Sequence, residues 1–473
     1  MNNSRRDFIR NTSLVSLGFL GLNQFAANAA TLGFIEKNNF VPNYGPLSYK
    51  QGDILSLPNG FSGKVISRRG EVMSDGLLSP GAHDGMGVFK WKNNKSILIR
   101  NHELSPGSKG SGPFGKNNEL LNKINQNDIY DFGKGDSMCY GGTTTMVYDE
   151  KLQKIELQYL SLIGTVRNCA GGITPWNSWI TCEETSFLKG DEKGLLEKDH
   201  GYNFEVFASD KIGLTKPVPI KQMGRFVHEA VTVHPIEGIV YQTEDSGDSL
   251  FYRYLPNKFG DLHKGGKLQC LALNDWASAD TRNWASLKTD RFPEKKEFNV
   301  SWIDLDDVEA PDGDLRLRGY KKGATRFSCG EGIWYGKNEL FFACTNGGLN
   351  GKGQIFKYVP SKYEGQDREK EFPAKLELYL EPNDISTFQN CDNLTIAPWG
   401  DVIICEDKAD ARIIGITPEG KTYEIAKNVG YRESEFAGPV FSPSGDTLFV
   451  NIQSPGLTLA ITGPWKSKYI QAS

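Results

Sequence analysis

One phrase recurs six times along the chain and restricts its fold more than any other feature of the sequence. Each copy runs from a small or acidic residue through an apolar strand, a turn and a second apolar strand to a polar cluster with Glu, Asp or Asn. Period-two alternation in these segments predicts β-strands. The sequence therefore predicts six β-hairpins. They span residues 83–103, 169–184, 228–245, 330–346, 392–407 and 436–453.

Repeated hairpins with irregular spacers are typical of a β-propeller, whose four-stranded blades of roughly 40–45 residues surround a central channel. We expect an all-β, six-bladed propeller formed by a single domain over residues 30–473. Two β-sandwiches would also contain many short strands, but these would not end repeatedly in the same polar cluster. Long interruptions would form loops and extra strands on one face, where sites commonly lie. They span residues 104–137, 185–226, 253–327 and 361–390.

The polar clusters are expected to meet at one mouth of the channel, because the inner strands of all blades run in the same direction. Carboxylates gathered in a dry site cannot all ionise without cations, so the ring predicts a multi-metal centre. A single acid of this kind often only caps a turn, but these recur at both ends of the hairpins. The predicted ring consists of Asp84, Asn101, Glu103, Cys169, Glu184, Glu229, Glu244, Asp245, Glu331, Asn346, Asp392 and Glu406.

The ring contains two kinds of metal ligand. Carboxylate and amide oxygens suit Ca²⁺, whereas a thiolate beside carboxylates suits a transition metal. Cys169 is the thiolate candidate, because it replaces an acid at a cavity-facing position near glycines that let the backbone approach closely. We expect His102 and His228 to orient ring carboxylates. Three cysteines at equivalent strand ends are expected to be buried core residues: Cys182, Cys344 and Cys405.

Residues 415–422 match the phosphate-binding P-loop pattern letter for letter. A P-loop must begin a helix, whereas this segment joins two alternating apolar runs through a Pro-Glu-Gly-Lys turn. We therefore predict a β-hairpin in which Gly420 adopts a positive φ. The acidic segment at residues 304–314 lacks the spacing of an EF-hand and is predicted to be a solvated loop.

The N-terminus has the pattern of a twin-arginine export signal. An arginine pair precedes an apolar stretch at residues 14–22 and a small-residue cleavage site at Ala27-Asn28-Ala29, so residues 1–29 are predicted to be a removable signal peptide. We expect a periplasmic or secreted monomer that engages the twin-arginine translocation machinery and has no stable membrane anchor. The formal net charge of −4 disfavours a nucleic-acid partner. The sequence leaves the pairing of its eight cysteines open.

Several phrases, taken in order, resemble the PhoX-type alkaline phosphatase family over essentially the whole mature chain. The resemblance implies a six-bladed propeller that is exported folded, holds two Fe³⁺ and several Ca²⁺ ions, and hydrolyses small phosphate monoesters. The motifs that carry it are Asn101-His102-Glu103, Asn168-Cys169-Ala170-Gly171-Gly172, Thr181-Cys182-Glu183-Glu184, His228-Glu229-Ala230, Thr243-Glu244-Asp245, Glu331-Gly332-Ile333-Trp334-Tyr335, Cys344-Thr345-Asn346-Gly347-Gly348, Asp392-Asn393-Leu394-Thr395 and Cys405-Glu406-Asp407.

The resemblance also implies roles for ring residues. Cys169 would bridge the irons and act in catalysis together with Glu229 and Glu331. The division of the acids between iron and calcium stays open. The other residues expected to bind these metals are Asn101, Glu103, Glu184, Glu244, Asp245, Asn346, Asp392 and Glu406.

One position departs from the family pattern. An arginine that binds the substrate phosphate is expected just before the equivalent of Glu331, but this chain has a cysteine and a glycine there. Arg326 is our candidate for the catalytic arginine, with Arg225 and Arg412 as alternatives. A different substrate or a loss of activity would also explain the departure.

Two other functions fit a metal-binding propeller. A calcium-dependent lactonase or esterase would hold its metal with Glu, Asn and Asp and would not need Cys169. A non-catalytic exported propeller would use the acids for a structural ion and its loops for binding. Iron content and substrate turnover distinguish these three hypotheses.

Overall fold

The computed structural model describes residues 44–134, 138–382, 384 and 386–465, which all belong to one unit, Pro42–Ser473. The predicted signal peptide at residues 1–29 lies outside the described residues. Within the described ranges, none of the helices has the length and apolar character that a membrane span requires.

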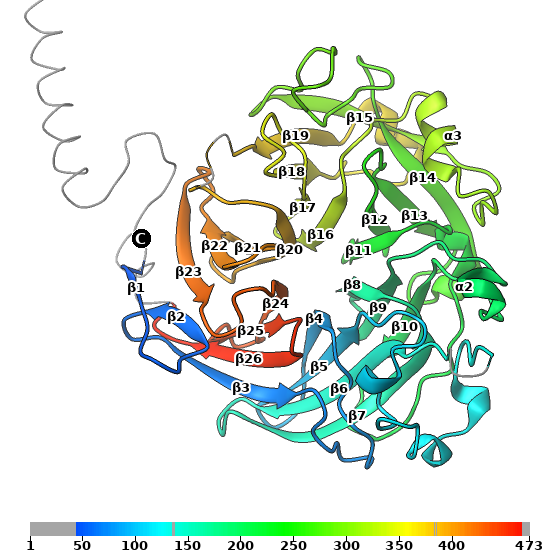
Figure 1. Cartoon of the computed structure of the whole chain (residues 1–473). Coiled ribbons are helices and arrows are strands. Elements are labelled where there is room, and N and C mark those ends of the chain that lie inside the picture. The colour runs from blue at the N-terminus through cyan, green and yellow to red at the C-terminus, as the bar shows by residue number, and fades with distance from the viewer. Residues whose placement is uncertain (1–43, 135–137, 383, 385, 466–473) are drawn as a thin grey trace, which may run out of the picture. The chain divides into compact units, whose positions relative to one another are not determined.

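Antiparallel strands account for most of the regular structure and form blades around a centre (Figure 1). The blades follow one another along the chain, and the first strand of each is the innermost. The first blade contains β4 (His83–Lys90), β5 (Lys95–His102), β6 (Gly141–Asp149) and β7 (Lys154–Thr165). The second contains β8 (Asn168–Ile173), β9 (Ser178–Glu183) and β10 (Asn203–Phe207). The third contains β11 (His228–Val233), β12 (Val240–Glu244), β13 (Tyr252–Pro256) and β14 (Gly266–Leu273).

The fourth and fifth blades have additional outer strands, whereas the sixth has four strands. The fourth contains β16 (Gly330–Tyr335), β17 (Leu340–Cys344), β18 (Gln354–Val359) and β19 (Lys375–Leu380). Strand β15 (Glu297–Asp304) pairs with both β14 and β19 and joins two blades into one nine-stranded sheet. The fifth contains β20 (Cys391–Ile396), β21 (Val402–Glu406), β22 (Arg412–Ile416) and β23 (Thr422–Asn428), extended by β2 (Leu55–Pro58) and β1 (Leu47–Ser48). The sixth contains β24 (Phe436–Phe441), β25 (Thr447–Ile452), β26 (Leu457–Thr462) and β3 (Ser62–Arg68).

The six inner strands surround the axis of the propeller. Strands β4, β8, β11, β16, β20 and β24 contact one another in a closed cycle in that order. Glycines allow the close approach, since a Cβ on Gly85 would lie 2.5 Å from the Cα of Ala170 and one on Gly332 would lie 2.6 Å from the Cα of Asn393. This arrangement confirms the predicted all-β propeller and shows that backbone packs tightly along this part of the axis.

Strand β3 closes the ring. It pairs with β26 from the other end of the described chain, with Ser62 opposite Thr462 and Arg68 opposite Leu457. The rings of Tyr44, Phe61 and Trp465 pack edge to face beside this junction, with centroids 4.6–5.8 Å apart. The sixth blade therefore depends on pairing between the two ends of the propeller.

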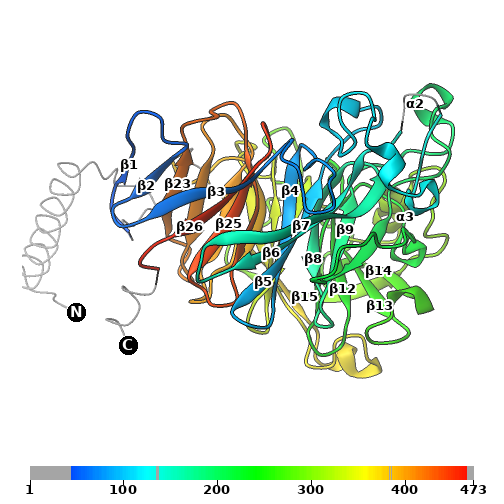
Figure 2. The ribbon, with the colours of Figure 1, turned by 90° about the horizontal axis from the view of Figure 1, so that it is seen from below.

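The long interruptions are not all on one face, which corrects that part of our expectation. The segment with η6 (Asp367–Glu371) lies at the opposite end of the blades from the segment with α2 (Asp191–Gly194) (Figure 2). There the buried guanidinium of Arg253 donates to Glu364 at 2.7 Å and to Glu369 of η6 at 2.8 Å. The remaining helices are η1 (Lys109–Ser111), η2 (Leu121–Lys123), η3 (Gln126–Asp128), η4 (Lys221–Met223), η5 (Leu262–Lys264) and α3 (Leu315–Lys321).

Two predictions about short segments are confirmed. The P-loop-like letters lie in a hairpin between β22 and β23, and Gly420 has a φ of 80°. The acidic segment at residues 304–314 forms ion pairs at the surface, including Asp306 with Lys322 and Asp314 with Arg318.

Candidate metal centre

The second residue of each inner strand occupies an equivalent place at one end of the axis. In five of these strands the register of hydrogen bonding shifts after the first residue. Such bulges re-aim the neighbouring side chain. The sixth strand has Ala437 at this place. The other five residues, which we call the inner ring, are Asp84, Cys169, Glu229, Glu331 and Asp392.

The inner-ring side chains are close enough to share ions. The Sγ of Cys169 lies 3.2 Å from Oε1 of Glu229. Cys169, Glu184 and Glu229 each offer a ligand atom, and these atoms lie within 4.8 Å of one another. Glu229, Glu331 and Asp392 form a second such group. The two candidate sites therefore share Glu229.

A second tier of acids directly follows the second strands of four blades. Gln453 has the corresponding place after β25 and links both tiers, because its Nε2 donates to Asp84 at 3.0 Å and to Glu103 at 2.8 Å. Residues from five blades thus meet in this tier. Its acids, which we call the outer ring, are Glu103, Glu184, Asp245 and Asp407.

Burial disfavours the charged forms of these groups. It raises the pKa of Glu229 well above the usual range, and the charges of Glu184 and Asp392 raise it further. Burial also raises the pKa of Glu184 to about 9 and that of Asp392 to about 7. The pKa of the Cys169 thiol is raised by burial and then by the charge of Asp84. Bound cations would oppose these shifts, since metals bind the deprotonated ligands.

Two acids that we placed in the ring point elsewhere. Glu244 and Glu406 end β12 and β21, one position before outer-ring acids, and successive strand residues face opposite sides. Glu406 accepts hydrogen bonds of 2.9 and 2.6 Å from the guanidinium of Arg412. Glu244 accepts one of 2.7 Å from the hydroxyl of Tyr252. Their expected position is therefore corrected, and both acids stabilise the interior of a blade.

The two amides of the predicted ring connect strands. Asn101 donates to two backbone carbonyls of β8 at 3.0 and 2.7 Å and accepts a hydrogen bond from Trp179 at 2.9 Å. Asn346 donates to the Sγ of Cys329 at 3.2 Å and accepts from the hydroxyl of Ser328. Both amides therefore already have protein partners.

The histidines beside the ring acids do not orient carboxylates, so this expectation was wrong. The ring nitrogens of His102 contact a backbone carbonyl at 2.8 Å and the hydroxyl of Thr144 at 3.0 Å. Those of His228 contact a backbone carbonyl at 3.0 Å and the amide of Asn203 at 3.2 Å. Burial lowers the pKa of both histidines, that of His228 to about 3. They are neutral groups that satisfy buried polar partners.

The three candidate arginines are engaged outside the inner ring. The guanidinium carbon of Arg326 lies 3.6 Å from the centre of the Tyr320 ring. Arg225 is buried and donates to four backbone carbonyls. Arg412 binds Glu406. None of these contacts directs a guanidinium to the inner ring.

Sequence reasoning missed three groups near the mouth: Asp407, Glu435 and Arg167. Burial raises the pKa of Glu435, and inner-ring carboxylates raise it further. The Nη2 of Arg167 forms ion pairs with Glu103 and Glu184. The repeat could have identified them, because each missed residue directly follows the second strand of a blade or directly precedes an inner strand.

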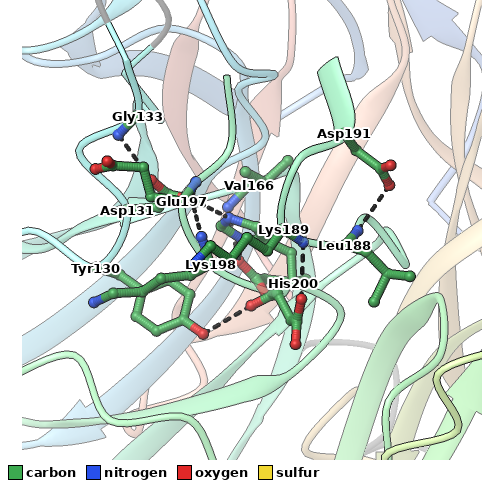
Figure 3. A network of polar contacts seen from close by, with 12 residues as sticks. Tyr130, Asp131, Gly133, Val166, Leu188, Lys189, Asp191, Glu197, Lys198 and His200 are labelled. Atoms are coloured by element: carbon green, nitrogen blue, oxygen red, sulfur yellow. Dashed lines mark hydrogen bonds and ion pairs between the residues drawn. The ribbon is translucent and has the colours of Figure 1, made fainter. Parts of the chain in front are cut away.

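A buried charged histidine fixes the backbone around this edge of the site (Figure 3). The ring nitrogens of His200 lie 2.6 Å from Oε1 of Glu183 and 3.2 Å from Oδ2 of Asp131. Burial opposes its charge, but the charge of Glu183 and the hydrogen bond with Asp131 outweigh burial and raise the pKa of His200 to about 12. Glu183 also accepts a hydrogen bond of 2.9 Å from the N–H of Val166. The network thus holds the backbone that leads into β8 and out of β9.

Asp131, His200 and Cys139 have the spacing of a metal site but form a complete structural network. Their ligand atoms lie within 4.8 Å of one another. Asp131 already accepts three backbone hydrogen bonds of 2.7–2.9 Å, and each ring nitrogen of His200 faces a carboxylate. We therefore assign this group to the anchoring of loops.

The cysteines divide as expected. Cys182, Cys344 and Cys405 are buried, whereas Cys169 is half-buried beside the acids. All eight cysteines are free thiols. Packing accounts for the first three and leaves Cys169 as a candidate ligand.

The donors fit two classes of cation. The thiol of Cys169 beside the carboxylate of Glu229 suits a transition metal such as iron. The oxygen-only group of Glu229, Glu331 and Asp392 suits a hard cation such as Ca²⁺. The residues present are therefore compatible with both metals that the resemblance implies.

Comparisons with known proteins bear on the family and the fold. The family model described as alkaline phosphatase PhoX matches residues 42–456. A structure of Pseudomonas fluorescens PhoX in complex with vanadate, a transition state analogue, has a TM-score of 0.63 at 16% identity and covers 90% of this chain and 98% of that chain. At that identity, the likeness shows the shared fold. A comparison with curated proteins gave no match.

Other propellers are less similar. A gluconolactonase from Xanthomonas campestris has a TM-score of 0.38 at 11% identity and covers 89% of this chain and 98% of that chain. Trypanosoma rangeli sialidase has a TM-score of 0.41 at 7% identity and covers 88% of this chain and 61% of that chain. These scores are too low to relate the chain to either protein.

Proposed function

We infer that this chain, which belongs to the alkaline phosphatase PhoX family, is an exported enzyme that hydrolyses small phosphate monoesters with iron and calcium ions. Family membership and the shared fold support a metal-dependent phosphatase. The Cys169 thiol lies close to the carboxylates of Glu184 and Glu229, and this arrangement supports the proposal that iron is one of the metals. A thiol in this position is not needed for an oxygen-only calcium site.

In this proposal, Cys169, Glu184 and Glu229 hold iron, and Glu331 and Asp392 hold calcium together with outer-ring acids. Two Fe³⁺ and several Ca²⁺ ions would supply the positive charge that phosphoryl transfer requires. The protein's contribution is to fix these ligands on the ends of strands whose backbones are already in contact. Such rigid placement supports catalysis by positioning.

The proposal also includes export and a monomeric state. Residues 1–29 have the twin-arginine pattern, and this pattern supports delivery to the periplasm or the exterior by the twin-arginine machinery. The net charge of −4 supports small phosphoesters rather than nucleic acid as partners. Size-exclusion chromatography of the mature protein would test the monomer.

The function is tested by metal analysis together with turnover. We would quantify iron and calcium in the purified protein, then assay p-nitrophenyl phosphate and lactones before and after chelation and after return of calcium. Phosphatase activity that falls with chelation and recovers with calcium is the expected result. Iron near zero would contradict the proposed mechanism, and turnover of lactones alone would favour the lactonase hypothesis.

Cys169→Ser tests the thiolate directly. We expect most of the iron to be lost and phosphatase activity to fall at least about 100-fold, because loss of a ligand costs more than the 10- to 100-fold typical of residues that only support ligands. Cys270→Ser is the matched control, since Cys270 is buried in an apolar cluster and its thiol lies 3.8 Å from the backbone carbonyl of Ile303. Equal iron and activity in both variants would show that Cys169 only fills space.

A further inference from the structure

We propose that Arg167 binds the phosphate group of the substrate at the mouth of the inner ring. This inference rests on the proposed phosphatase function and names a residue of this chain that recognises the common part of all its substrates. It follows from the position, contacts and charge of Arg167.

Arg167 directly precedes an inner strand. Each of the six inner strands has such a preceding residue, and we call these six places the entry positions. Four of these residues adopt a left-handed backbone, with φ between 44° and 50°, which non-glycine residues rarely do. Such local strain clusters at active sites and ligand clamps. Arg167 alone among the six carries a positive charge. The entry positions are Ala82, Arg167, Val227, Cys329, Asn390 and Glu435.

The guanidinium of Arg167 reaches both the acids and the solvent. Its Nη2 lies 3.0 Å from Oε1 of Glu103 and 2.5 Å from Oε2 of Glu184. Its Nε is buried and has no hydrogen-bond partner among the residues that the structure describes. The side chain is nevertheless 38% exposed. Nη2 is therefore bound to the outer ring, and the exposed part of the guanidinium leaves donor capacity for a ligand that arrives from solvent.

The backbone of Arg167 is held firmly. Its N–H donates to the carbonyl of Leu104 at 3.1 Å, and its carbonyl accepts from the N–H of Glu184 at 2.9 Å. The preceding residue, Val166, is held by Glu183, which the charged His200 contacts. A guanidinium attached to a backbone that is held in this way loses little conformational freedom when it binds a ligand.

Arg167 offers a phosphate monoester a cation at the mouth, in addition to the metal ions of the proposed function. The carboxylates at the mouth repel a dianion, whereas a guanidinium binds phosphate oxygens through paired N–H donors. Because Arg167 also contacts Glu103 and Glu184, it would place the phosphate next to two outer-ring acids. Contact with the phosphate rather than with the leaving group would make recognition independent of the alcohol.

The test compares phosphate binding, turnover and metal content in the metal-loaded full protein. Calorimetry with inorganic phosphate and kinetics with p-nitrophenyl phosphate would be measured for the wild type, Arg167→Gln and Arg167→Lys. We expect Arg167→Gln to weaken phosphate binding and to lower kcat/KM by about 10- to 100-fold, as the loss of hydrogen bonds from a charged group does. Arg167→Lys should recover part of the phosphate affinity, because it restores the charge but not the paired donors.

Arg318→Gln is the matched control. Arg318 forms ion pairs with Asp306 and Asp314 but belongs to α3, so its loss should leave phosphate affinity unchanged. Equal phosphate affinity in the wild type and Arg167→Gln would overturn the proposal. So would a loss of affinity that matches a loss of metal, because Arg167 would then only hold Glu103 and Glu184.

The same measurements separate this proposal from the proposed function. Phosphate binding that depends on Arg167 in a protein without hydrolysis would contradict the phosphatase function alone. Hydrolysis and phosphate binding that survive Arg167→Gln with all metals in place would contradict the role of Arg167 alone. A wild-type protein that does not bind phosphate would contradict both.

Discussion

At the scale of single residues, the side of the strand decides what each acid does. Glu406 and Asp407 are consecutive, yet Glu406 accepts two hydrogen bonds from Arg412 inside a blade. Asp407 belongs to the outer ring, where its charge contributes to the raised pKa of Asp392 after the larger effect of burial. The two neighbouring carboxylates therefore lie in different surroundings, one inside a blade and one in the outer ring.

This separation predicts opposite results for two single substitutions. Asp407→Asn should weaken calcium binding by about 10- to 100-fold and change the free energy of unfolding by less than about 0.5 kcal/mol. Glu406→Gln should lower the free energy of unfolding by about 3 kcal/mol, because it leaves the buried charge of Arg412 without its main partner. Calcium titration and chemical denaturation of both variants would check this. Equal calcium affinity in both variants would contradict the assignment.

Sequence reasoning located the inner ring better than the outer one. Asp84, Cys169, Glu229, Glu331 and Asp392 share one position relative to a recognisable strand start, so the repeat alone identified them. The end of the second strand has to be located to the exact residue, because an error of one residue moves a side chain to the opposite face of the sheet. That error placed Glu244 and Glu406 in the ring and omitted Asp407.

At the scale of elements, contact between inner strands sets the spacing of the inner-ring side chains. A Cβ on Gly332 would lie 2.6 Å from the Cα of Asn393, so β16 and β20 touch through their backbones. Glu331 and Asp392 precede these two residues. Any separation of the two strands would therefore also separate two inner-ring carboxylates.

Gly332→Ala tests this coupling. The added methyl group should lower the free energy of unfolding by about 1–3 kcal/mol, as overpacking does, and should weaken calcium binding in the same variant. Gly213→Ala is the control, since a Cβ at Gly213 meets no atom within 4 Å. Thermal unfolding and calcium titration would be compared for both. Normal calcium affinity in a destabilised Gly332→Ala protein would show that strand spacing does not control the site.

The hairpins were predictable as elements, but their connections were not. Each hairpin has its own period-two pattern and turn, so local sequence was sufficient. The pairing of β15 with both β14 and β19 depends on strands far apart in sequence. Glu369 of η6 binds the buried guanidinium of Arg253, and the burial of that arginine cannot be known before the fold.

At the scale of the whole molecule, the buried acids make stability depend on pH and metal. A carboxyl group whose pKa is raised in the folded state stabilises the fold at low pH, and this contribution is lost as the pH rises through the raised value. The pKa is raised to about 7 for Asp392 and to about 9 for Glu184, mainly by burial. The metal-free protein should therefore lose stability between roughly pH 4 and pH 9.

Thermal unfolding at pH 5, 7 and 9 would test this prediction. We expect Tm to fall with rising pH much more steeply in chelated protein than in metal-loaded protein, because bound metal keeps the ligands deprotonated. His200, with its pKa raised to about 12 by Glu183 and Asp131 against the effect of burial, also loses stabilisation as pH rises above about 6.5. The loss from His200 is the same in the chelated and the metal-loaded protein. The difference in Tm between the two therefore measures the effect of the buried acids. Parallel curves would contradict the prediction.

The closure of the propeller by β3 and β26 has a consequence for the time course of synthesis. At roughly 5–20 residues per second, about 20–80 s separate the completion of Arg68 from the arrival of Leu457, its partner in the last blade. During this interval β3 lacks its partner strand, and an unpaired strand edge is prone to join other chains. A nascent chain therefore carries this unpaired strand for about 20–80 s, and its cycle of inner strands is closed only when synthesis is almost finished.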